Sequence, residues 1–561
     1  MTEYLELKAT DCKHCYKCIR NCPVKAIRFA DNQATIMQDE CILCGRCFVS
    51  CPQNAKRVHN DLPKAQALIA GEKPIIASVA PSFVANYPGV TIEDLKAALL
   101  ALGFHGAEET ALGATLVKQR YDEMVCEGRQ SVIISTCCHT VNMLVEKYYP
   151  AVLPHLAAVI SPMQAHARMI HQRCPEAAVI FIGPCVSKKA EAEHYPGDVD
   201  CVLTYDELDA WLAEKGLSLQ ASMAQQKHDK DRQGRARVFP VAGGILRTMR
   251  CENPDYSYLT VDGMDNCIAA LEDIAAGNLH NCFVEMSACN GSCIGGPAMN
   301  HASGLIRSTM QVDTYASQTD FAVTEDAADM EKHLQFSAPP RPHFGEKAIT
   351  EVLQKIGKRK PEDELNCGSC GYDTCREKAL AVLAGKANLE MCLPYLMGKA
   401  QSFSDAIIHN TPNGILVLNE FLEIQQINQA ACSIMNVKQE ADVLGRNVVC
   451  LMDPALFFEV LEKELPIYDR RQYLAEYDRY IDLTVIRDAT SNLVIGIMRD
   501  TTETETGRMA RRRMADKTIQ ITDEVIDKQM RTVQEVASLL GETVAETKIA
   551  LTNLKETLRN E

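Results

Sequence analysis

The cysteines of this chain are the residues most able to do chemistry. There are 25 of them among 561 residues, and two kinds of chemistry compete for them: disulfide formation and metal binding by thiolates. Disulfides are typical of small secreted domains. This chain is long, and its first residues, Met-Thr-Glu-Tyr-Leu-Glu-Leu, lack the basic and apolar stretches of a secretory signal. Metal–thiolate chemistry is therefore the better interpretation, and the spacing of the cysteines supports it.

Residues 1–62 contain the same cysteine pattern twice, and we assign them to a ferredoxin-like α+β domain. Each run reads Cys-x2-Cys-x2-Cys-x3-Cys-Pro. In bacterial two-cluster ferredoxins with this spacing, the fourth cysteine of each run ligates the other cluster. The spacing therefore predicts one 4Fe–4S cluster on Cys12, Cys15, Cys18 and Cys51, and a second on Cys41, Cys44, Cys47 and Cys22. Zinc is the alternative, but zinc modules usually pair two Cys-x2-Cys units across a longer loop.

Three further segments place cysteines near glycines, which permit close approach of the backbone to a bound group. They are residues 135–139 (Ser-Thr-Cys-Cys-His), 183–191 (Gly-Pro-Cys-Val-Ser-Lys-Lys-Ala-Glu) and 285–296 (Glu-Met-Ser-Ala-Cys-Asn-Gly-Ser-Cys-Ile-Gly-Gly). All lie within residues 70–335, where short β-branched runs alternate with helical stretches, as in an α/β domain. Together and in this order, the segments resemble the signature of the iron-only (FeFe) hydrogenases.

This resemblance implies an H-cluster, in which a 4Fe–4S cubane is joined to a two-iron subsite that carries CO, cyanide and a bridging dithiolate. It implies that the cubane is held by Cys138, Cys185, Cys289 and Cys293, with Cys293 bridging to the subsite. It also implies roles for residues around the subsite: Cys137 as the thiol that delivers protons, Lys188 as a donor to one cyanide, Ala80, Pro81 and Ser82 as the segment against the other cyanide, and Gly243 and Gly244 as a glycine pair lining the pocket. Cyanide carries negative charge, so buried donors such as a lysine and a serine suit it.

Several residues depart from the pattern of catalytic family members. His139 follows the cysteine pair where proline is usual, and Ser287 stands where the family has methionine. By rough register, residues 119–121 (Gln-Arg-Tyr) occupy the place of glutamates that relay protons. A relay group must both take and release a proton, and arginine cannot release one near neutral pH. Glu123 or Glu191 could substitute, but we expect an altered path and slow turnover.

Residues 345–400 hold another cysteine group in a helical setting. Cys367, Cys370, Cys375 and Cys392 resemble a small helical 4Fe–4S module of several redox and corrinoid proteins, with zinc as the alternative. Eight cysteines remain unassigned, and we interpret them as buried small apolar residues in a reducing, anaerobic cytosol. They are Cys126, Cys174, Cys201, Cys251, Cys267, Cys282, Cys432 and Cys450.

Residues 403–503 resemble a PAS domain, an α+β module that binds small cofactors, mediates dimers or passes signals. The resemblance rests on residues 407–415, 423–431 and 444–447 and identifies no ligand. In photoreactive flavin PAS domains a cysteine directly follows Gly-Arg-Asn, where Val448 stands here, so we expect no photoreactive flavin.

Residues 504–561 are expected to form a helix. Their apolar residues follow two seven-residue series offset by four: Ile526, Val533, Leu540 and Leu554, and Met530, Ala537, Val544, Leu551 and Leu558. This pattern predicts either the seam of a coiled coil or a helix packed on its own domain.

Composition sets the remaining limits. At about 150 residues per domain the length corresponds to roughly four domains. The net charge of −16 argues against a nucleic-acid partner. No apolar run reaches the roughly 18 residues of a membrane span, so we expect a cytoplasmic protein without membrane association. A PAS domain followed by a helix, without a kinase signature, predicts a homodimer whose output is a signalling kinase or phosphatase in trans.

These features favour a sensory FeFe hydrogenase that binds and slowly turns over H2 and signals through its PAS domain. The alternative is a working FeFe hydrogenase, which oxidises H2 or reduces protons with ferredoxin or another one-electron carrier. Either would contain one H-cluster and three additional 4Fe–4S clusters. A third hypothesis is a cluster-bearing scaffold without the two-iron subsite. Cys137, Lys188 and Ser82 argue against it, because a cubane alone would not need them.

Overall fold

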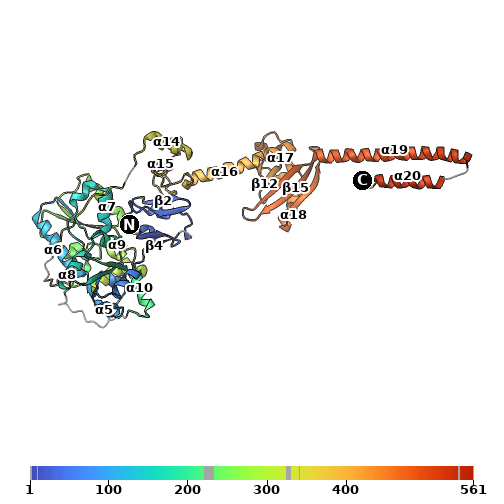
Figure 1. The fold of residues 1–561 in the computed structure, drawn as a ribbon. Coiled ribbons are helices and arrows are strands. Elements are labelled where there is room, and N and C mark those ends of the chain that lie inside the picture. The colour runs from blue at the N-terminus through green and yellow to red at the C-terminus, as the bar shows by residue number, and fades with distance from the viewer. Residues whose placement is uncertain are drawn as a thin grey trace. The chain divides into compact units, whose positions relative to one another are not determined.

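The computed structural model describes residues 3–8, 11–219, 233–323, 330–339, 342–540 and 544–559, and Figure 1 labels its elements. The chain divides into two compact units, residues 1–395 and residues 396–561. In the described part of the chain, no helix combines the length and apolarity needed to cross a membrane.

In the N-terminal region, each cysteine run contains a short helix. β1 (Leu5–Leu7) pairs antiparallel with β4 (Lys56–Val58), and β2 (Ile27–Ala30) pairs antiparallel with β3 (Gln33–Ile36). Helix α1 (Lys17–Asn21) lies within the first cysteine run and α2 (Arg46–Val49) within the second. This is the predicted ferredoxin-like α+β arrangement.

Two parallel sheets form the centre of the region that follows. One has the strand order β6 (Gly106–Glu109), β5 (Ile75–Val79), β8 (Ala178–Gly183) and β9 (Cys201–Thr204). The other has the order β10 (Ser257–Asp262), β11 (Cys282–Ser287) and β7 (Val132–Ile134). The central strands β8 and β11 are buried along their whole length, as expected when both faces of a parallel sheet are covered. The prediction of an α/β region is confirmed.

Helices connect and cover these strands. They are α3 (Leu62–Ile69), α4 (Phe83–Asn86), α5 (Ile92–Ala101), α6 (Ala111–Glu127), α7 (His139–Tyr148), α8 (Pro162–Arg173), α9 (Ser187–His194), α10 (Tyr205–Glu214), α11 (Gly244–Thr248), α12 (Met264–Ala275) and α13 (Leu305–Tyr315). The start of α10 shows why such helices begin where they do. The Thr204 hydroxyl accepts from the Glu207 backbone N–H while the Glu207 carboxylate accepts from the Thr204 backbone N–H, which is a capping box.

In the third cysteine group, Cys367 and Cys370 lie between α14 (Glu346–Lys355) and α15 (Cys375–Leu383). Cys375 begins α15, and Cys392 comes after it. A single helix, α16 (Leu393–Asn410), follows it. The predicted domain ends at residues 400 and 403 both lie inside this helix, so a change of domain is not marked by a loop here.

The second unit contains the five-stranded antiparallel sheet of a PAS domain. Its order is β13 (Ile424–Ile427), β12 (Gly414–Leu418), β16 (Leu493–Asp500), β15 (Arg479–Asp488) and β14 (Ile467–Leu474). Helices α17 (Gln429–Ile434) and α18 (Ala455–Lys463) contribute Ala431, Phe457 and Val460 to the core beside this sheet.

The tail is not the single helix that the sequence predicted. It forms α19 (Thr502–Leu540) and α20 (Val544–Arg559), and α20 folds back along α19 (Figure 1). An ion pair of 3.0 Å joins Lys555 to Asp523 across the two helices. Ile526, Met530 and Val533 are shielded on the face of α19, so this part of the apolar series packs the chain against itself. Leu554 and Leu558, of the same series, are exposed in α20. The side chains of Ala537, Leu540 and Val544, also in that series, lie outside the described residues.

Two of the eight unassigned cysteines are not buried. Cys126 and Cys450 are exposed, which corrects the prediction for these positions. Cys126 lies on the outward face of α6, beside the buried Val125. Cys450 is the last residue of a short 3-10 helix, Val448–Cys450, whose buried residue is Val448. Cys201, Cys267, Cys282 and Cys432 are buried as predicted, and Cys174 and Cys251 are partly buried.

Candidate functional site

A cavity of about 100 Å³ lies where four parallel strands end. Residues 80–82 follow β5, Cys137 and Cys138 follow β7, Cys185 follows β8, and Ser287 ends β11. Ligands of α/β proteins bind outside the carboxyl ends of the strands. The cavity is lined by most of the predicted site residues: Ala80, Pro81, Ser82, Cys137, Cys138, Cys185, Lys188, Ser287 and Cys293. The structure therefore brings together residues that are more than 200 positions apart.

Three predicted site residues lie beside the cavity without lining it. Gly243 and Gly244 begin α11, whose Ile245 reaches the cavity. Cys289 borders a second hollow, together with Cys44 of the N-terminal region. Cys289 therefore lies between the cavity and the second cysteine run, which is where a route for electrons into the site would pass.

The four thiols predicted to hold the cubane lie close together. Burial raises the pKa of the Cys289 thiol, and the charges of Cys185, Cys138 and Cys293 raise it further. Burial likewise raises the pKa of Cys293 to about 12. Such thiols stay protonated unless a metal replaces the proton. The donor set of four clustered sulfurs fits an iron–sulfur cubane.

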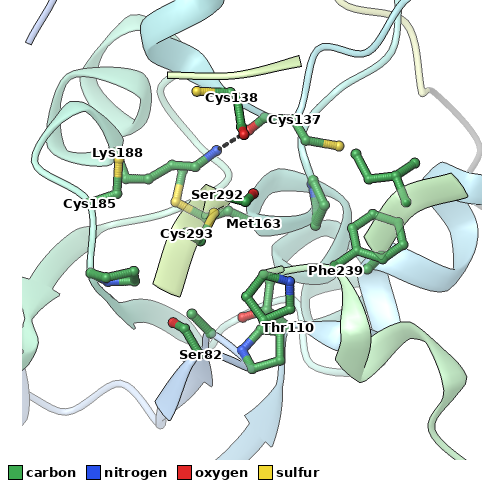
Figure 2. A pocket seen from close by; sticks show the side chains of 18 of the residues that line it. Ser82, Thr110, Cys137, Cys138, Met163, Cys185, Lys188, Phe239, Ser292 and Cys293 are labelled. Carbon is green, nitrogen blue, oxygen red and sulfur yellow. Dashed lines mark hydrogen bonds between the residues drawn. The ribbon is translucent and has the colours of Figure 1, made fainter. Parts of the chain in front are cut away.

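Lys188 and Ser82 face the cavity from opposite sides (Figure 2). Lys188 Nζ donates to the carbonyl of Cys137 at 3.1 Å and pairs with Glu191. Burial opposes the charge of Lys188, but Glu191 outweighs it and raises its pKa above the usual value. Glu191 also pairs with Lys332 at 2.8 Å, and its side chain is fully buried. It is therefore committed to two lysines, and Lys188 presents a fixed positive charge to the cavity.

Ser82 is fully buried, and its Oγ lies 2.7 Å from the hydroxyl of Tyr205. The Tyr205 hydroxyl donates to the carbonyl of Ala80 at 3.2 Å. Tyr205 has one proton, so the serine proton is free to point into the cavity only when Tyr205 donates to Ser82 in place of Ala80. A lysine on one side and a hydroxyl on the other suit a group with anionic ligands at two ends, as the predicted subsite has.

The Cys137 thiol contacts Tyr121, one of the residues that the sequence places where the family has glutamates. Tyr121 Oη lies 3.3 Å from Cys137 Sγ and 3.3 Å from Thr136 Oγ1. The Thr136 hydroxyl donates to the carbonyl of Val159 at 2.7 Å. Burial raises the pKa of Cys137 to about 12. The chain of contacts from this thiol therefore ends at a carbonyl, which cannot pass a proton on.

The two carboxylates suggested as substitutes do not reach the thiol. Glu123 is on the surface, paired with Arg120, and Glu191 is held by its lysines. A third carboxylate, Glu285, lines the cavity and was not considered from sequence. Burial raises its pKa to about 7, although backbone N–H groups at the start of α11 oppose this. Glu285 holds the Gly243–Gly244 turn in place and is neutral in mildly acidic solution.

Ser287 lines the cavity at the position where the family has methionine. Thioethers are still present, because Met163 and Met286 line the same cavity. The replacement of a methionine thioether by a serine hydroxyl is therefore confined to one position of the cavity wall.

The N-terminal cysteines gather as the spacing predicts. Cys12, Cys15, Cys18 and Cys51 line one small cavity. The pKa of Cys47 is raised by burial and by Cys44, Cys41 and Cys22, so these four also lie together. Among the described residues, no three His, Cys, Asp or Glu side chains are close enough for a single metal ion, whereas a four-iron cluster needs ligands that are farther apart.

The third cysteine group packs on the first cysteine run of the N-terminal region, which contains α1. Gly371 has φ of +94°, and a Cβ there would lie 2.8 Å from Ile19 in α1. Lys25 Nζ donates to the carbonyl of Gly371 at 3.0 Å, and Lys386 pairs with Glu40 at 2.5 Å. Cys370, next to Gly371, is thereby held against the helix that leads to Cys22.

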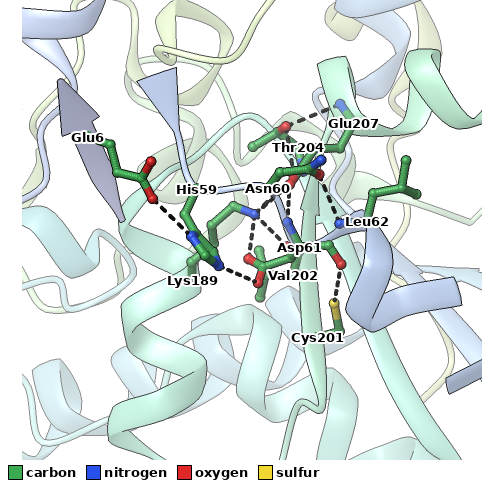
Figure 3. A network of polar contacts seen from close by, with 10 residues as sticks. All are labelled: Glu6, His59, Asn60, Asp61, Leu62, Lys189, Cys201, Val202, Thr204 and Glu207. Carbon is green, nitrogen blue, oxygen red and sulfur yellow. Dashed lines mark hydrogen bonds and ion pairs between the residues drawn. The ribbon is translucent and has the colours of Figure 1, made fainter. Parts of the chain in front are cut away.

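A buried network anchors the helix that carries Lys188 (Figure 3). The next residue, Lys189, has a side chain that is 1% exposed and pairs with Asp61 at 2.6 Å and Glu207 at 2.9 Å. His59 joins Asp61 to Glu6 in β1, at 3.8 Å and 3.3 Å. The network therefore ties α9 to α10 and to the N-terminal region, and so fixes where Lys188 points.

Family models match four parts of the chain. Residues 4–68 match a 4Fe-4S dicluster domain, residues 73–297 the iron only hydrogenase large subunit, C-terminal domain, residues 363–394 a putative Fe-S cluster, and residues 402–471 the PAS fold. The chain thus contains a dicluster domain, a PAS domain and the C-terminal domain found in the large chain of iron-only hydrogenases. The predicted dicluster, hydrogenase-type and PAS domains and the predicted fold class are confirmed.

Curated relatives match part of the chain. The cytosolic Fe-S cluster assembly factor NAR1 of Yarrowia lipolytica is 28% identical over 33% of this chain and 45% of its own length. Iron hydrogenase 1 of Clostridium pasteurianum is 23% identical over 48% of this chain and 65% of its own length. The chain thus spans about half to two thirds of these relatives. Among solved structures, a variant of the FeFe-hydrogenase HydA1 from Chlamydomonas reinhardtii has a TM-score of 0.40 and 16% identity, covering 50% of this chain and 100% of its own.

The crossed ligation of the first two clusters predicts a pattern of iron loss. The variant with both Cys12→Ser and Cys51→Ser should lose about as much iron as either single variant, because both cysteines serve one cluster, and the variant with Cys12→Ser and Cys22→Ser should lose about twice as much. Iron content per chain after anaerobic reconstitution measures this. Equal losses in the two double variants would contradict the crossed assignment.

Lys189→Met should destabilise the protein by about 3–5 kcal/mol, because it leaves two buried carboxylates without their partner. The readout is the thermal unfolding midpoint. Lys64→Met is the matched control, since Lys64 is exposed. An unchanged midpoint for Lys189→Met would show that the network does not hold α9.

Because the pKa of Glu285 is raised in the folded protein, we expect the free energy of unfolding to depend on pH. Its pKa is about 7 in the folded protein and near 4.3 in an unfolded chain, so its favourable contribution is complete below the lower value and is lost as the pH rises through about 7. The wild type should therefore lose about 3–4 kcal/mol relative to Glu285→Gln between about pH 4 and about pH 8. Unfolding midpoints of both proteins across this range measure it. If the unfolding midpoints of the wild type and Glu285→Gln changed in parallel with pH, the raised pKa of Glu285 would be contradicted.

Proposed function

We propose that the chain is a sensory FeFe hydrogenase, which binds and slowly turns over H2 at an H-cluster and passes the signal through its PAS domain to a partner in trans. The observation that carries this proposal is the cavity at the strand ends. It combines three of the four clustered thiols, a further thiol at Cys137, and the donors Lys188 and Ser82. The fourth clustered thiol, Cys289, lies beside it. The bound cluster would supply the chemistry of H2 cleavage.

The residues around the cavity define what the protein contributes. Cys138, Cys185, Cys289 and Cys293 would hold the cubane, while Lys188 and Ser82 would donate to anionic ligands of the subsite. The apolar wall, which includes Phe239 and Ile245, excludes water. The Cys137 thiol would hold a proton at the subsite, but its contacts end at the carbonyl of Val159. The described hydrogen bonds of this thiol include no carboxylate that could exchange its proton with solvent, and this favours slow turnover of H2. Proton transfer by a positioned group contributes about 10²–10⁴-fold to the rate of a reaction.

The packing of the third cysteine group supports a route for the signal. Gly371 and Lys386 dock this group on the N-terminal region, and Cys44 of that region borders the same hollow as Cys289. We infer that electrons released from H2 reach the third cluster through the N-terminal clusters. Its last ligand, Cys392, directly precedes α16, the helix that leads to the PAS sheet.

Two other functions remain as alternatives. A working hydrogenase is favoured by Glu285, a carboxylate of the cavity wall whose pKa of about 7 suits proton exchange. A role in iron–sulfur assembly, without the two-iron subsite, is favoured by the relatives named as cytosolic Fe-S cluster assembly factors.

One experiment separates the three functions. The protein is matured anaerobically with the two-iron subsite, its CO and cyanide infrared bands are recorded, and H2 oxidation is assayed with a viologen dye. A sensor should show bands that respond to H2 and turnover below about 1 s⁻¹, the low end for enzymes. Fast turnover would identify a working hydrogenase, and the absence of bands would leave the assembly role. Lys188→Met, with Lys64→Met as control, should change the cyanide bands.

A further inference from the structure

A second chain of hydrogen bonds leads from the cavity toward the protein surface. Thr110 lines the cavity (Figure 2). Its Oγ1 lies 2.8 Å from Ser78 Oγ, and this oxygen lies 2.8 Å from His166 Nδ1. His166 Nε2 lies 3.2 Å from Glu108 Oε2. The side chains of Ser78 and His166 are fully buried, whereas that of Glu108 is 27% exposed. The chain is therefore continuous from the cavity wall to a residue that water reaches.

Three elements far apart in the sequence build this chain. Ser78 lies in β5, Glu108 and Thr110 lie at the end of the neighbouring β6, and His166 comes from α8. The approach of α8 depends on Gly113 in α6, where a Cβ would lie 2.5 Å from the backbone nitrogen of His166. A glycine at this point lets the imidazole reach Ser78.

Each member of the chain can pass a proton. Both nitrogens of His166 have partners, so the imidazole can accept a proton at Nε2 and release one at Nδ1. The hydroxyls of Ser78 and Thr110 can each donate and accept at once. Burial opposes ionisation of Glu108, but His166 and then Arg173 outweigh it and lower its pKa to about 2. Arg173 donates to both oxygens of Glu108, at 3.0 and 2.6 Å. The carboxylate is therefore ionised at neutral pH and takes up a proton only transiently, so proton supply through it is slow, in keeping with slow turnover.

The chain differs from the contacts of Cys137 in where it ends. The thiol leads through Tyr121 and Thr136 to the carbonyl of Val159, and this carbonyl has no proton to give. The four residues on the opposite wall end at a carboxylate in contact with solvent. The two routes also enter the cavity on different sides, since Cys137 follows β7 and Thr110 follows β6.

We propose that Glu108, His166, Ser78 and Thr110 form a proton relay between solvent and the cavity. The inference rests on the proposed two-iron site, which would be the acceptor. A proton from water binds a Glu108 oxygen transiently and passes to Nε2 of His166 in the tautomer that carries its hydrogen on Nδ1. The Nδ1–H bond breaks as its proton moves to Ser78, the serine proton moves to Thr110, and the threonine proton enters the cavity. One proton enters for each one delivered, no electron moves, and the sequence is reversible.

The test follows the subsite itself rather than H2 turnover. In the matured protein, rapid mixing to a lower pH should convert the pH-dependent CO bands at a rate set by proton supply. Ser78→Ala breaks the middle of the relay and Glu108→Gln breaks its outer end. Each should slow the conversion by about a hundredfold, with the band positions unchanged. Because the steps are in series, the double variant should be no slower than the slower single variant.

Controls separate the relay from a structural effect. His171→Phe changes another histidine of α8, whose Nε2 contacts a backbone carbonyl, and should leave the rate unchanged. His166→Gln should slow conversion even where the protein folds normally, because an amide does not shuttle protons at this pH. Wild-type rates in both Ser78→Ala and Glu108→Gln would overturn the relay and leave the proposed function intact. A wild type without CO bands would overturn the proposed function, and the relay with it.

Discussion

The convergence of parallel strand ends is the constraint on which the rest of this structure depends. Each cysteine segment is short and follows a buried strand, so the segment has no freedom once the strand is in its sheet. Two sheets, β6-β5-β8-β9 and β10-β11-β7, direct their carboxyl ends to one cavity, where thiols from three separate segments meet. Burial raises the pKa of the Cys138, Cys289 and Cys293 thiols, which couples the stability of the site to bound iron.

The buried lysines of the helix beside this cavity each form ion pairs with carboxylates. Lys188 and Lys332 share Glu191, while Lys189 is shared by Asp61 and Glu207. Unpaired charges at such depth would be costly, so the pairs fix which single positive group faces the cavity. The two chains of hydrogen bonds that leave the cavity differ in where they end. The contacts of Cys137 pass through Tyr121 and end at a buried backbone carbonyl, whereas those of the other wall pass through His166 and end at Glu108, which is in contact with solvent.

The sequence alone predicted the features that depend on local spacing of residues. It did not predict the contacts between segments that are far apart in the chain. The cysteine runs and the buried β-branched strands were evident because each is a short pattern with a physical period. The contact of Tyr121 with Cys137, and the assembly of Ser78, Glu108 and His166, arise from strands and helices that no local pattern links. The apolar series of the tail was seen correctly, but its spacing does not distinguish a second chain from α20. The docking of Gly371 on Ile19 likewise had no local signal.

Locating iron in crystals of the anaerobically matured protein tests the central claim most directly. An anomalous difference map at the iron edge should show a four-iron cluster bounded by Cys138, Cys185, Cys289 and Cys293. Two further irons should lie beside Cys293, between Lys188 and Ser82. A cavity that contains no iron, or an iron cluster that these four cysteines do not ligate, would contradict the account.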